Sequence, residues 1–157
     1  MAAVAAEVNH MEFSIIEGLL NAQEYNDLRE SVGWKTYDLA VAEKGLMGSL
    51  YGVCAFVNGE IVGMARILGD GGLVYYIQDV IVRPEFQGNG IGSAMMDRIM
   101  GYIQAHASQN SIVGLMSARG KEAFYARYGF VQRPNERMGC GMTIFWSGDD
   151  REHRRNA

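Results

Sequence analysis

With 157 residues, the chain has the length of one globular domain with a substantial core. Its 48% apolar and 20% charged residues are the ordinary mixture of a globular protein. Because the net charge is -4 and no cluster of Lys and Arg mixes with aromatic residues, we do not expect a nucleic-acid-binding surface.

Cysteine and histidine spacing indicates neither a disulfide framework nor a metal site. Cys54 and Cys140 lie far apart in unrelated contexts, and the histidines at His10, His106 and His153 lack ligand spacing. The first ten residues do not have the pattern of a signal peptide. No apolar run approaches the roughly 18 residues of a membrane-spanning helix. We therefore expect a chain that does not bind membranes and that works in the reducing cytoplasm.

The first part of the chain predicts a strand followed by two helices. Residues 11–17 have the pattern of a strand. Asn21 is a good helix N-cap, and Glu24 three residues later completes a capping box. Gly33 ends this helix. The connector that follows is expected to contain one short helix over residues 39–47.

Two apolar runs then predict a β-hairpin. The runs at 50–57 and 60–68 are separated by Asn58-Gly59, whose residues both tolerate positive φ. The sequence GDGG at 69–72 marks another turn, and residues 73–82 form the next predicted strand. These strands are therefore expected to be antiparallel neighbours.

The rest of the chain predicts two more helices and three short strands. A helical stripe of apolar residues covers 91–106, and a shorter helix is expected at 121–128. The predicted strands lie at 112–116, 130–132 and 142–146.

These elements predict one α/β domain in which helices flank a mixed, mostly antiparallel sheet. Its core is expected over residues 12–146. The ends, 1–10 and 147–157, have the composition of loose termini.

Three glycines, Gly88, Gly90 and Gly92, lie between a predicted strand and the helix at 91–106. A tight turn would need only one of them. A dinucleotide fingerprint is a poor fit because Ser93 occupies the place of its third glycine, and a P-loop would need Gly-Lys-Ser/Thr. The remaining alternative is a pyrophosphate cradle, in which backbone N–H groups of the loop and the helix terminus bind an anion.

The run QGNGIG at 87–92 matches Q/R-x-x-G-x-G/A, and the chain here resembles the acetyl-CoA signature of the GNAT superfamily of N-acetyltransferases. The preceding DVIV and Arg-Pro, and the later AFYARYGF at 123–130, are also similar to motifs of that family. The resemblance covers residues 12–146 and implies a GNAT-like acyl-CoA N-acyltransferase fold with acetyl-CoA as co-substrate and no metal. It assigns acetyl-CoA binding to Val80, Ile81, Val82, Gln87, Gly88, Asn89, Gly90, Ile91, Gly92 and Ser93.

The resemblance also implies a mechanism in which the acetyl group passes directly to an amine in a ternary complex. The backbone N–H of Val80 would hold the thioester carbonyl, and Val82 would pair with the pantetheine arm. Tyr125 occupies the tyrosine place of the FY-x-x-x-GF motif and is the expected proton donor to the thiolate, since a tyrosine with a pKa near 10 is protonated at neutral pH. The alternative for Tyr125 is packing in an aromatic core.

An alkyl ammonium has a pKa near 10.4, so a general base or a water relay would help the reaction. Asp79 is the candidate base, and Tyr76 and Gln78 are candidate water holders. Because side chains alternate along a strand, Asp79 shares a face with these two only if a bulge intervenes. The alternative for Asp79 is a structural hydrogen-bonding role.

The acceptor-binding candidates are Trp34, Tyr37, Arg66 and Asp70. Trp34 and Tyr37 could wall an amine site or simply pack, and Arg66 could grip an anion or pair with a neighbouring carboxylate. The expected acceptor is a primary amine of a small molecule, and IQDVIV also resembles the matching strand of glucosamine-6-phosphate N-acetyltransferases. The alternatives are a protein N-terminus or lysine as acceptor, or a non-catalytic acyl-CoA sensor. A homodimer paired through residues 142–146 is a further expectation.

Overall fold

The computed structural model describes residues 11–146, which form two compact units that meet in sequence between Leu115 and Met116. The first unit contains a five-stranded sheet in the order β1-β2-β3-β4-β5. Its strands are β1 Ser14–Glu17, β2 Tyr51–Val57, β3 Glu60–Gly69, β4 Val74–Val82 and β5 Ile112–Gly114. The first three pairs are antiparallel and the last is parallel, which confirms the mixed α/β sheet. The prediction that a single domain spans the whole chain stays a prediction.

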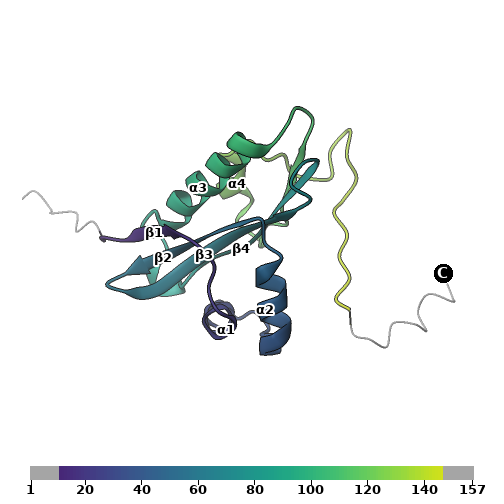
Figure 1. Ribbon diagram of the computed structural model, residues 1–157. Helices are drawn as coiled ribbons and strands as arrows, with labels where there is room; N and C mark the ends of the chain where they lie inside the picture. The colour runs from purple at the N-terminus through teal and green to yellow at the C-terminus, as the bar shows by residue number, and fades with distance from the viewer. Residues whose placement is uncertain (1–10, 147–157) are drawn as a thin grey trace, which may run out of the picture. The chain divides into compact units, whose positions relative to one another are not determined.

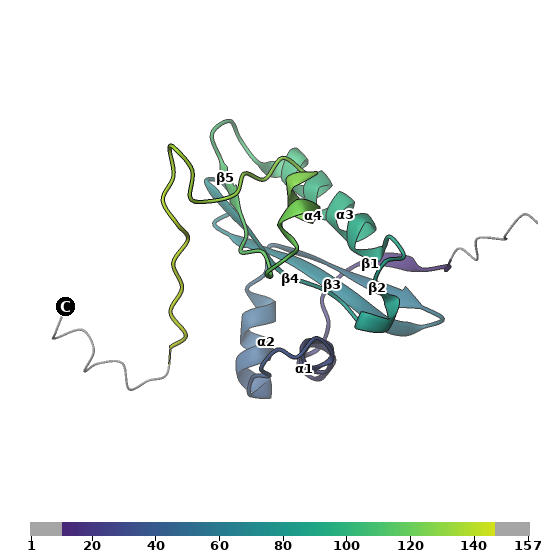
Figure 2. The same ribbon diagram turned by 180° about the vertical axis from the view of Figure 1, so that it is seen from behind.

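Helices cover both faces of this sheet (Figures 1 and 2). Helices α1 (Ala22–Ser31) and α2 (Leu39–Met47) lie on one face, and α3 (Ile91–His106) lies on the other. A short 3-10 turn, Pro84–Phe86, connects β4 to the loop before α3. Among residues 11–146, none of the helices is long and apolar enough to cross a membrane.

Local sequence signals set the first helix and the hairpin as predicted. Asn21 accepts a hydrogen bond from the Glu24 amide at 2.9 Å, and the Glu24 carboxylate accepts one from the Asn21 amide at 3.0 Å. Both capping-box bonds are therefore present. Asn58 and Gly59 have φ values of 49° and 80°, the positive values that a tight hairpin between β2 and β3 requires.

The sheet buries a separate set of side chains on each face. The cluster under α1 and α2 consists of Leu20, Tyr25, Leu28, Ala42, Leu46, Cys54, Met64 and Ile81. Helix α3 buries Ile91, Met95, Met96, Ile99 and Ile103. At Gly63, an added Cβ would lie 2.8 Å from the Ile81 carbonyl oxygen and 3.2 Å from Met95 Cε, so this glycine permits close packing of α3 on the sheet. The start of α3 is thereby fixed relative to the end of β4.

The second unit corrects two predictions. It contains α4 (Glu122–Ala126), close to the helix predicted at 121–128. Over residues 116–146 it contains no strand, so the strands predicted at 130–132 and 142–146 are wrong. Met142 and Phe145 are each 90% exposed. The apolar residues at these positions favour an extended strand. A strand also needs a neighbouring strand to which its backbone can hydrogen-bond, and propensity alone does not provide one.

Candidate active site

Strand β4 carries a bulge at Asp79 and Val80. These two residues face the single residue Ala65 of β3, where the register of the ladder shifts. Asp79 has a φ of 54°, in the left-handed region that non-glycine residues rarely adopt. The bulge directs Asp79 to the sheet face that also carries Gln78, whose side-chain nitrogen lies 3.5 Å from Asp79 Oδ1. The bulge that Asp79 needs in order to share a sheet face with Gln78 is therefore present.

After Tyr76, β4 has a ladder partner on one side only within the first unit. Strand β5 pairs with β4 at Val74, Tyr75 and Tyr76, and the pairing stops there. Residues 77–82 pair with β3 alone. An open strand edge offers backbone donors and acceptors to an extended ligand. This edge fits a pantetheine arm.

The loop after β4 leads into a helix N-terminus without a side-chain cap. Gly88 and Gly90 have φ values of 79° and 82°, and Gly90 is the N-cap of α3. No heavy atom lies within 4 Å of a Cβ added at either position. The glycines are therefore required by backbone conformation, and the space beside them is open. The first amides of α3, with the positive end of its dipole, form an anion site that fits a CoA pyrophosphate.

Two amide side chains of the predicted cradle brace this loop. Gln87 Nε2 donates to the Val82 carbonyl oxygen at 2.9 Å. Asn89 Nδ2 donates to the carbonyl oxygens of Phe86 and Gln87 at 3.0 and 3.1 Å. Both residues thus hold the shape of the loop and tie it to the end of β4.

The remaining cradle residues divide between core and helix start. Ile81 and Ile91 are 2% and 1% exposed, so their side chains belong to the core and only their backbones can serve a ligand. Gly92 and Ser93 lie in the first turn of α3, where the uncapped amides are.

Asp79 is the centre of a buried ion cluster, defined here as Asp79, Tyr25, Arg29 and Arg66. Arg29 Nη1 lies 2.9 Å from Asp79 Oδ1, and Arg66 Nε lies 2.7 Å from Oδ2. The Tyr25 hydroxyl donates to Oδ2 at 3.0 Å. The Asp79 side chain has no exposed surface. Burial, and next the negative charge of Asp79, raise the pKa of Tyr25 to about 12.

This geometry favours a structural role for Asp79 over that of general base. Both carboxylate oxygens already accept hydrogen bonds from charged or hydroxyl donors, and the group is closed to solvent. A base must reach the proton that it removes. These contacts agree with the structural role that the sequence left as the alternative for Asp79, and its role as general base stays a prediction. Tyr76 and Gln78 remain candidate water holders, since both are partly exposed beside the bulge.

Trp34 and Tyr37, the aromatic residues predicted to line the acceptor site, lie against the guanidinium group of Arg29. The Arg29 guanidinium carbon lies 5.2 Å from the Trp34 ring centroid and 4.8 Å from that of Tyr37. Trp34 and Tyr37 thus pack around Arg29, which agrees with the packing alternative, and their role in amine binding stays a prediction. Sequence reasoning missed Arg29, although its position four residues after Tyr25 places it on the buried stripe of α1.

Arg66 and Asp70, the other two acceptor-binding candidates, also make hydrogen bonds within the protein. In addition to its ion pair, Arg66 Nη1 donates to the Gly45 carbonyl oxygen and to Ser49 Oγ, both at 3.1 Å. Asp70 Oδ1 accepts from the backbone amides of residues 72–74. These backbone hydrogen bonds lower the pKa of Asp70. Arg66 thus belongs to the ion cluster and Asp70 to a turn, and their role in acceptor binding stays a prediction.

Tyr125 lies in α4 of the second unit, among aromatic neighbours. Its ring makes edge contacts with Phe124 and Phe130, with centroid separations of 5.0 and 6.4 Å. Burial raises the pKa of Tyr125, which keeps its hydroxyl protonated at neutral pH. The aromatic packing and the protonated hydroxyl are both present, and its role as proton donor stays a prediction.

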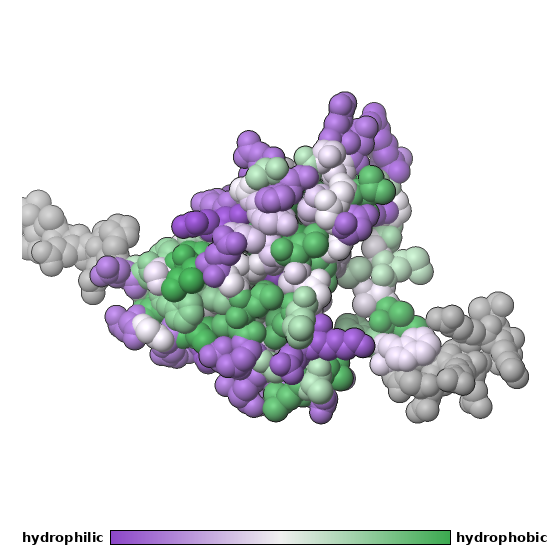
Figure 3. All heavy atoms as spheres, in the orientation of Figure 1, coloured by the Kyte–Doolittle hydropathy of each residue, from purple (hydrophilic) through white to green (hydrophobic). Residues whose placement is uncertain are grey.

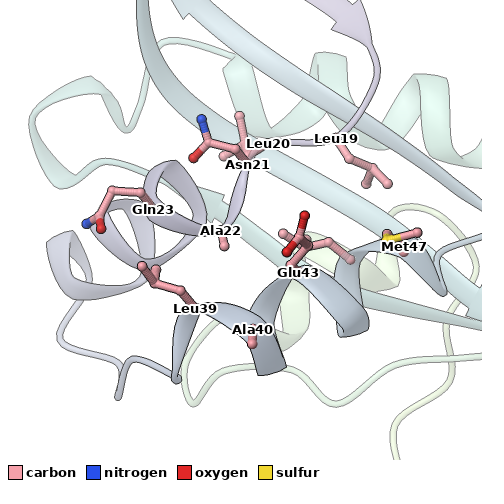
Figure 4. Close-up of a pocket in the computed structure, with 10 residues that line it drawn as sticks. Leu19, Leu20, Asn21, Ala22, Gln23, Leu39, Ala40, Glu43 and Met47 are labelled. Carbon is pink, nitrogen blue, oxygen red and sulfur yellow. The ribbon is translucent and has the colours of Figure 1, made fainter.

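A groove of about 530 Å³ lies between the start of α1 and helix α2 (Figure 4). Its lining includes Leu19, Leu20, Leu39, Leu46, Met47 and Glu43. Figure 4 shows the Glu43 carboxylate directed from α2 toward the segment that carries Leu19 and Leu20. Hydrophobic side chains also reach the surface near these helices (Figure 3). None of the predicted acceptor residues lines this groove.

Over residues 11–146, no group of three or more His, Cys, Asp or Glu side chains is arranged to hold a metal ion. The site thus presents an open strand edge, a backbone anion site and a buried ion cluster. This combination suits an acyltransferase that binds its donor through backbone atoms.

Comparison with known proteins identifies the family. The family model described as an acetyltransferase (GNAT) domain matches residues 21–145. The solved structure of SA2161 from meticillin-resistant Staphylococcus aureus, a probable acetyltransferase, superposes with a TM-score of 0.79 and 30% identity, covering 86% of this chain and 100% of that one. The chain belongs to the GNAT family and is an N-acetyltransferase. The family takes its acetyl group from acetyl-CoA.

Two relatives found by sequence have either lower identity or lower coverage than the SA2161 structure. The uncharacterized N-acetyltransferase ycf52 of Pyropia yezoensis is 28% identical over 131 residues, covering 81% of this chain and 72% of the relative. Serotonin N-acetyltransferase 2, chloroplastic, of Oryza sativa subsp. japonica is 32% identical over 84 residues, covering 54% of this chain and 41% of the relative.

The raised pKa of Tyr25 predicts a loss of stability at alkaline pH. The unfolded chain releases the phenol proton near pH 10, whereas the folded protein holds it until about pH 12. Between these values the unfolded state binds fewer protons, so the free energy of unfolding falls as pH rises. Urea unfolding at pH 9 and pH 11 should show a loss about 1 kcal/mol larger in the wild type than in Tyr25→Phe. Equal losses in both proteins would contradict this prediction.

Proposed function

We propose that this N-acetyltransferase transfers the acetyl group of acetyl-CoA directly to a primary amine of a small molecule. The observation that carries the donor half is the uncapped, glycine-led N-terminus of α3 beside the open edge of β4. The two features lie at opposite ends of one short loop, 83–90, which suits a ligand with an anionic end and an extended arm.

In the proposed complex, backbone N–H groups of the loop and of α3 bind the pyrophosphate. A hydrogen bond to a charged group contributes roughly 1.5–3 kcal/mol, so a few such bonds suffice for micromolar affinity. The pantetheine arm extends the sheet along residues 77–82, and the Val80 N–H polarises the thioester carbonyl. The bound acetyl-CoA supplies an activated acyl group with a thiolate leaving group.

The proton steps are assigned to Tyr125 and to water. Attack of the amine nitrogen forms the N–C bond and breaks the C–S bond, and Tyr125 donates its proton to the departing sulfur. The ammonium proton leaves through water held near Tyr76 and Gln78, since Asp79 is occupied by its arginines. A tyrosine whose pKa is raised by burial remains in the protonated form that this role needs.

The groove between α1 and α2 supports a small-molecule acceptor. Its volume of about 530 Å³ falls within the range of small-ligand pockets. Apolar side chains with one carboxylate, Glu43, suit an ammonium group on an apolar body. The relative is named for serotonin, a primary alkyl amine attached to an aromatic ring system, and so supports the same class of acceptor.

Two further predictions are retained as proposals. The cytoplasmic location agrees with Cys54 and Cys140 both being free thiols. Homodimer formation through residues 142–146 agrees with the exposure of Met142 and Phe145.

A thermal-shift titration tests the donor half. Acetyl-CoA and CoA should each raise Tm by several degrees, because saturation to about 100 times Kd adds roughly 2.7 kcal/mol, whereas NAD and ATP should not. Gly90→Ala should abolish most of this shift, since alanine is strained at a φ of 82° in the anion site. Gly101→Ala is the matched control, because it adds a methyl in open space within α3 and should leave the shift intact. No shift in the wild type would overturn the donor assignment.

An acceptor screen that follows free CoA thiol tests the other half. We expect turnover with apolar primary amines, of which serotonin and tyramine are the first probes. Glu43→Gln should raise the amine KM about tenfold through loss of one charge-assisted contact, with the acetyl-CoA Kd unchanged. Turnover only with lysine-containing peptides or free protein N-termini would identify a protein acceptor. CoA binding without turnover on the whole panel would indicate an acyl-CoA sensor.

Tyr125→Phe tests the general acid. It should lower kcat by about 100-fold, the scale of general acid catalysis, while the acetyl-CoA Kd stays the same. Tyr128→Phe removes a hydroxyl from the same aromatic cluster and serves as the control. An unchanged kcat in Tyr125→Phe would rule out its catalytic role.

A further inference from the structure

We propose that Tyr25, Arg29 and Arg66 are positioning residues for acetyl transfer. They hold Asp79 in the left-handed conformation that makes the bulge, and so direct the N–H of Val80 at the thioester carbonyl. This inference rests on the proposed function, because it concerns the backbone donor assigned there to the acetyl group.

The bulge has a conformation that needs support. Asp79 is not a glycine, yet its φ is 54° inside a strand that is otherwise extended. Such a conformation costs free energy and persists only where the surroundings hold it in place. The support must therefore come from contacts of Asp79 itself.

The contacts of Asp79 restrain both oxygens of its carboxylate. Oδ1 pairs with Arg29 Nη1 at 2.9 Å, while Oδ2 accepts from Arg66 Nε at 2.7 Å and from the Tyr25 hydroxyl at 3.0 Å. The donors come from α1 and β3, two elements that both precede β4 in the chain. Rotation of the side chain would break at least two short contacts in a region closed to water.

Each arginine is in turn fixed by the chain around it. Arg29 Nε donates to the Lys35 carbonyl oxygen at 2.8 Å. Arg66 Nη1 bonds to the carbonyl oxygen of Gly45 and to Ser49 Oγ. The connector and the end of α2 thus stabilise the two cations that hold the carboxylate. A guanidinium is suited to this task because its planar donors point in fixed directions.

The N–H of Val80 belongs to the peptide unit that follows the Cα of Asp79. The backbone angles at Asp79 therefore set the direction of this N–H. A catalytic donor must be held close to its productive direction, because hydrogen bonds weaken steeply when misaligned. Loosening the cluster should thus disturb the acetyl end of the site while leaving the pyrophosphate end, on α3, unaffected.

Amide NMR on the ¹⁵N-labelled protein tests this separation. In the wild type, the amides of residues 88–92 should shift with both CoA and acetyl-CoA, and the Val80 amide should shift further with acetyl-CoA than with CoA. In Tyr25→Phe and Arg66→Lys, this additional Val80 shift should fall to less than half, with the loop shifts unchanged. Leu28→Val is the matched control, because Leu28 is fully buried on the same helix and lies outside the cluster.

The outcomes separate the two proposals. If no amide of the loop responds in the wild type, the proposed function fails. If the loop responds but both variants keep the full Val80 shift, the positioning role is overturned. A control that loses the Val80 shift as the variants do would also overturn it, by showing a general effect of destabilisation. Tyr25→Phe keeps its ring in the core, so it can report even if Arg66→Lys does not fold.

Discussion

The pairing of the buried Asp79 carboxylate with two arginines and a tyrosine is the interaction on which the shape of β4 and the proposed donor site depend. An ionised carboxylate without exposed surface is tolerated only when its charge and lone pairs are satisfied. Here two guanidinium groups and one phenol satisfy them. Because these donors come from a helix and a neighbouring strand, the packing of α1 on the sheet and the local shape of β4 are parts of one arrangement.

The opposite face of the sheet contributes a different constraint. Helix α3 buries five apolar side chains and so fixes the position of its own N-terminus. The anion site depends on this packing and on the braced loop before it. The two ends of the donor site are therefore supported by separate faces of the same sheet, and strand β4 connects them.

Local signals in the sequence predicted most elements and the glycine loop. The helices at 39–47 and 91–106 match the structure to the residue, since caps, periodicity and turn glycines act within a few residues. The strand predicted at 142–146 failed because pairing depends on a distant partner. The contacts of Trp34 and Asp79 with Arg29 could not be predicted for the same reason, since these residues meet only after folding.

The ion cluster has a consequence for the acceptor amine. Two arginines and one aspartate leave it with a net charge of +1, in a region where little water screens the charge. An ammonium group that approaches Val80 is disfavoured relative to its neutral amine, so we expect the pKa of the bound acceptor to fall below that of the free molecule. An ionisation in the kcat profile, which reports the bound complex, that coincides with free-amine ionisation would argue against this effect. The protein can thus favour proton loss through its electrostatic field, in place of a side chain that removes the proton.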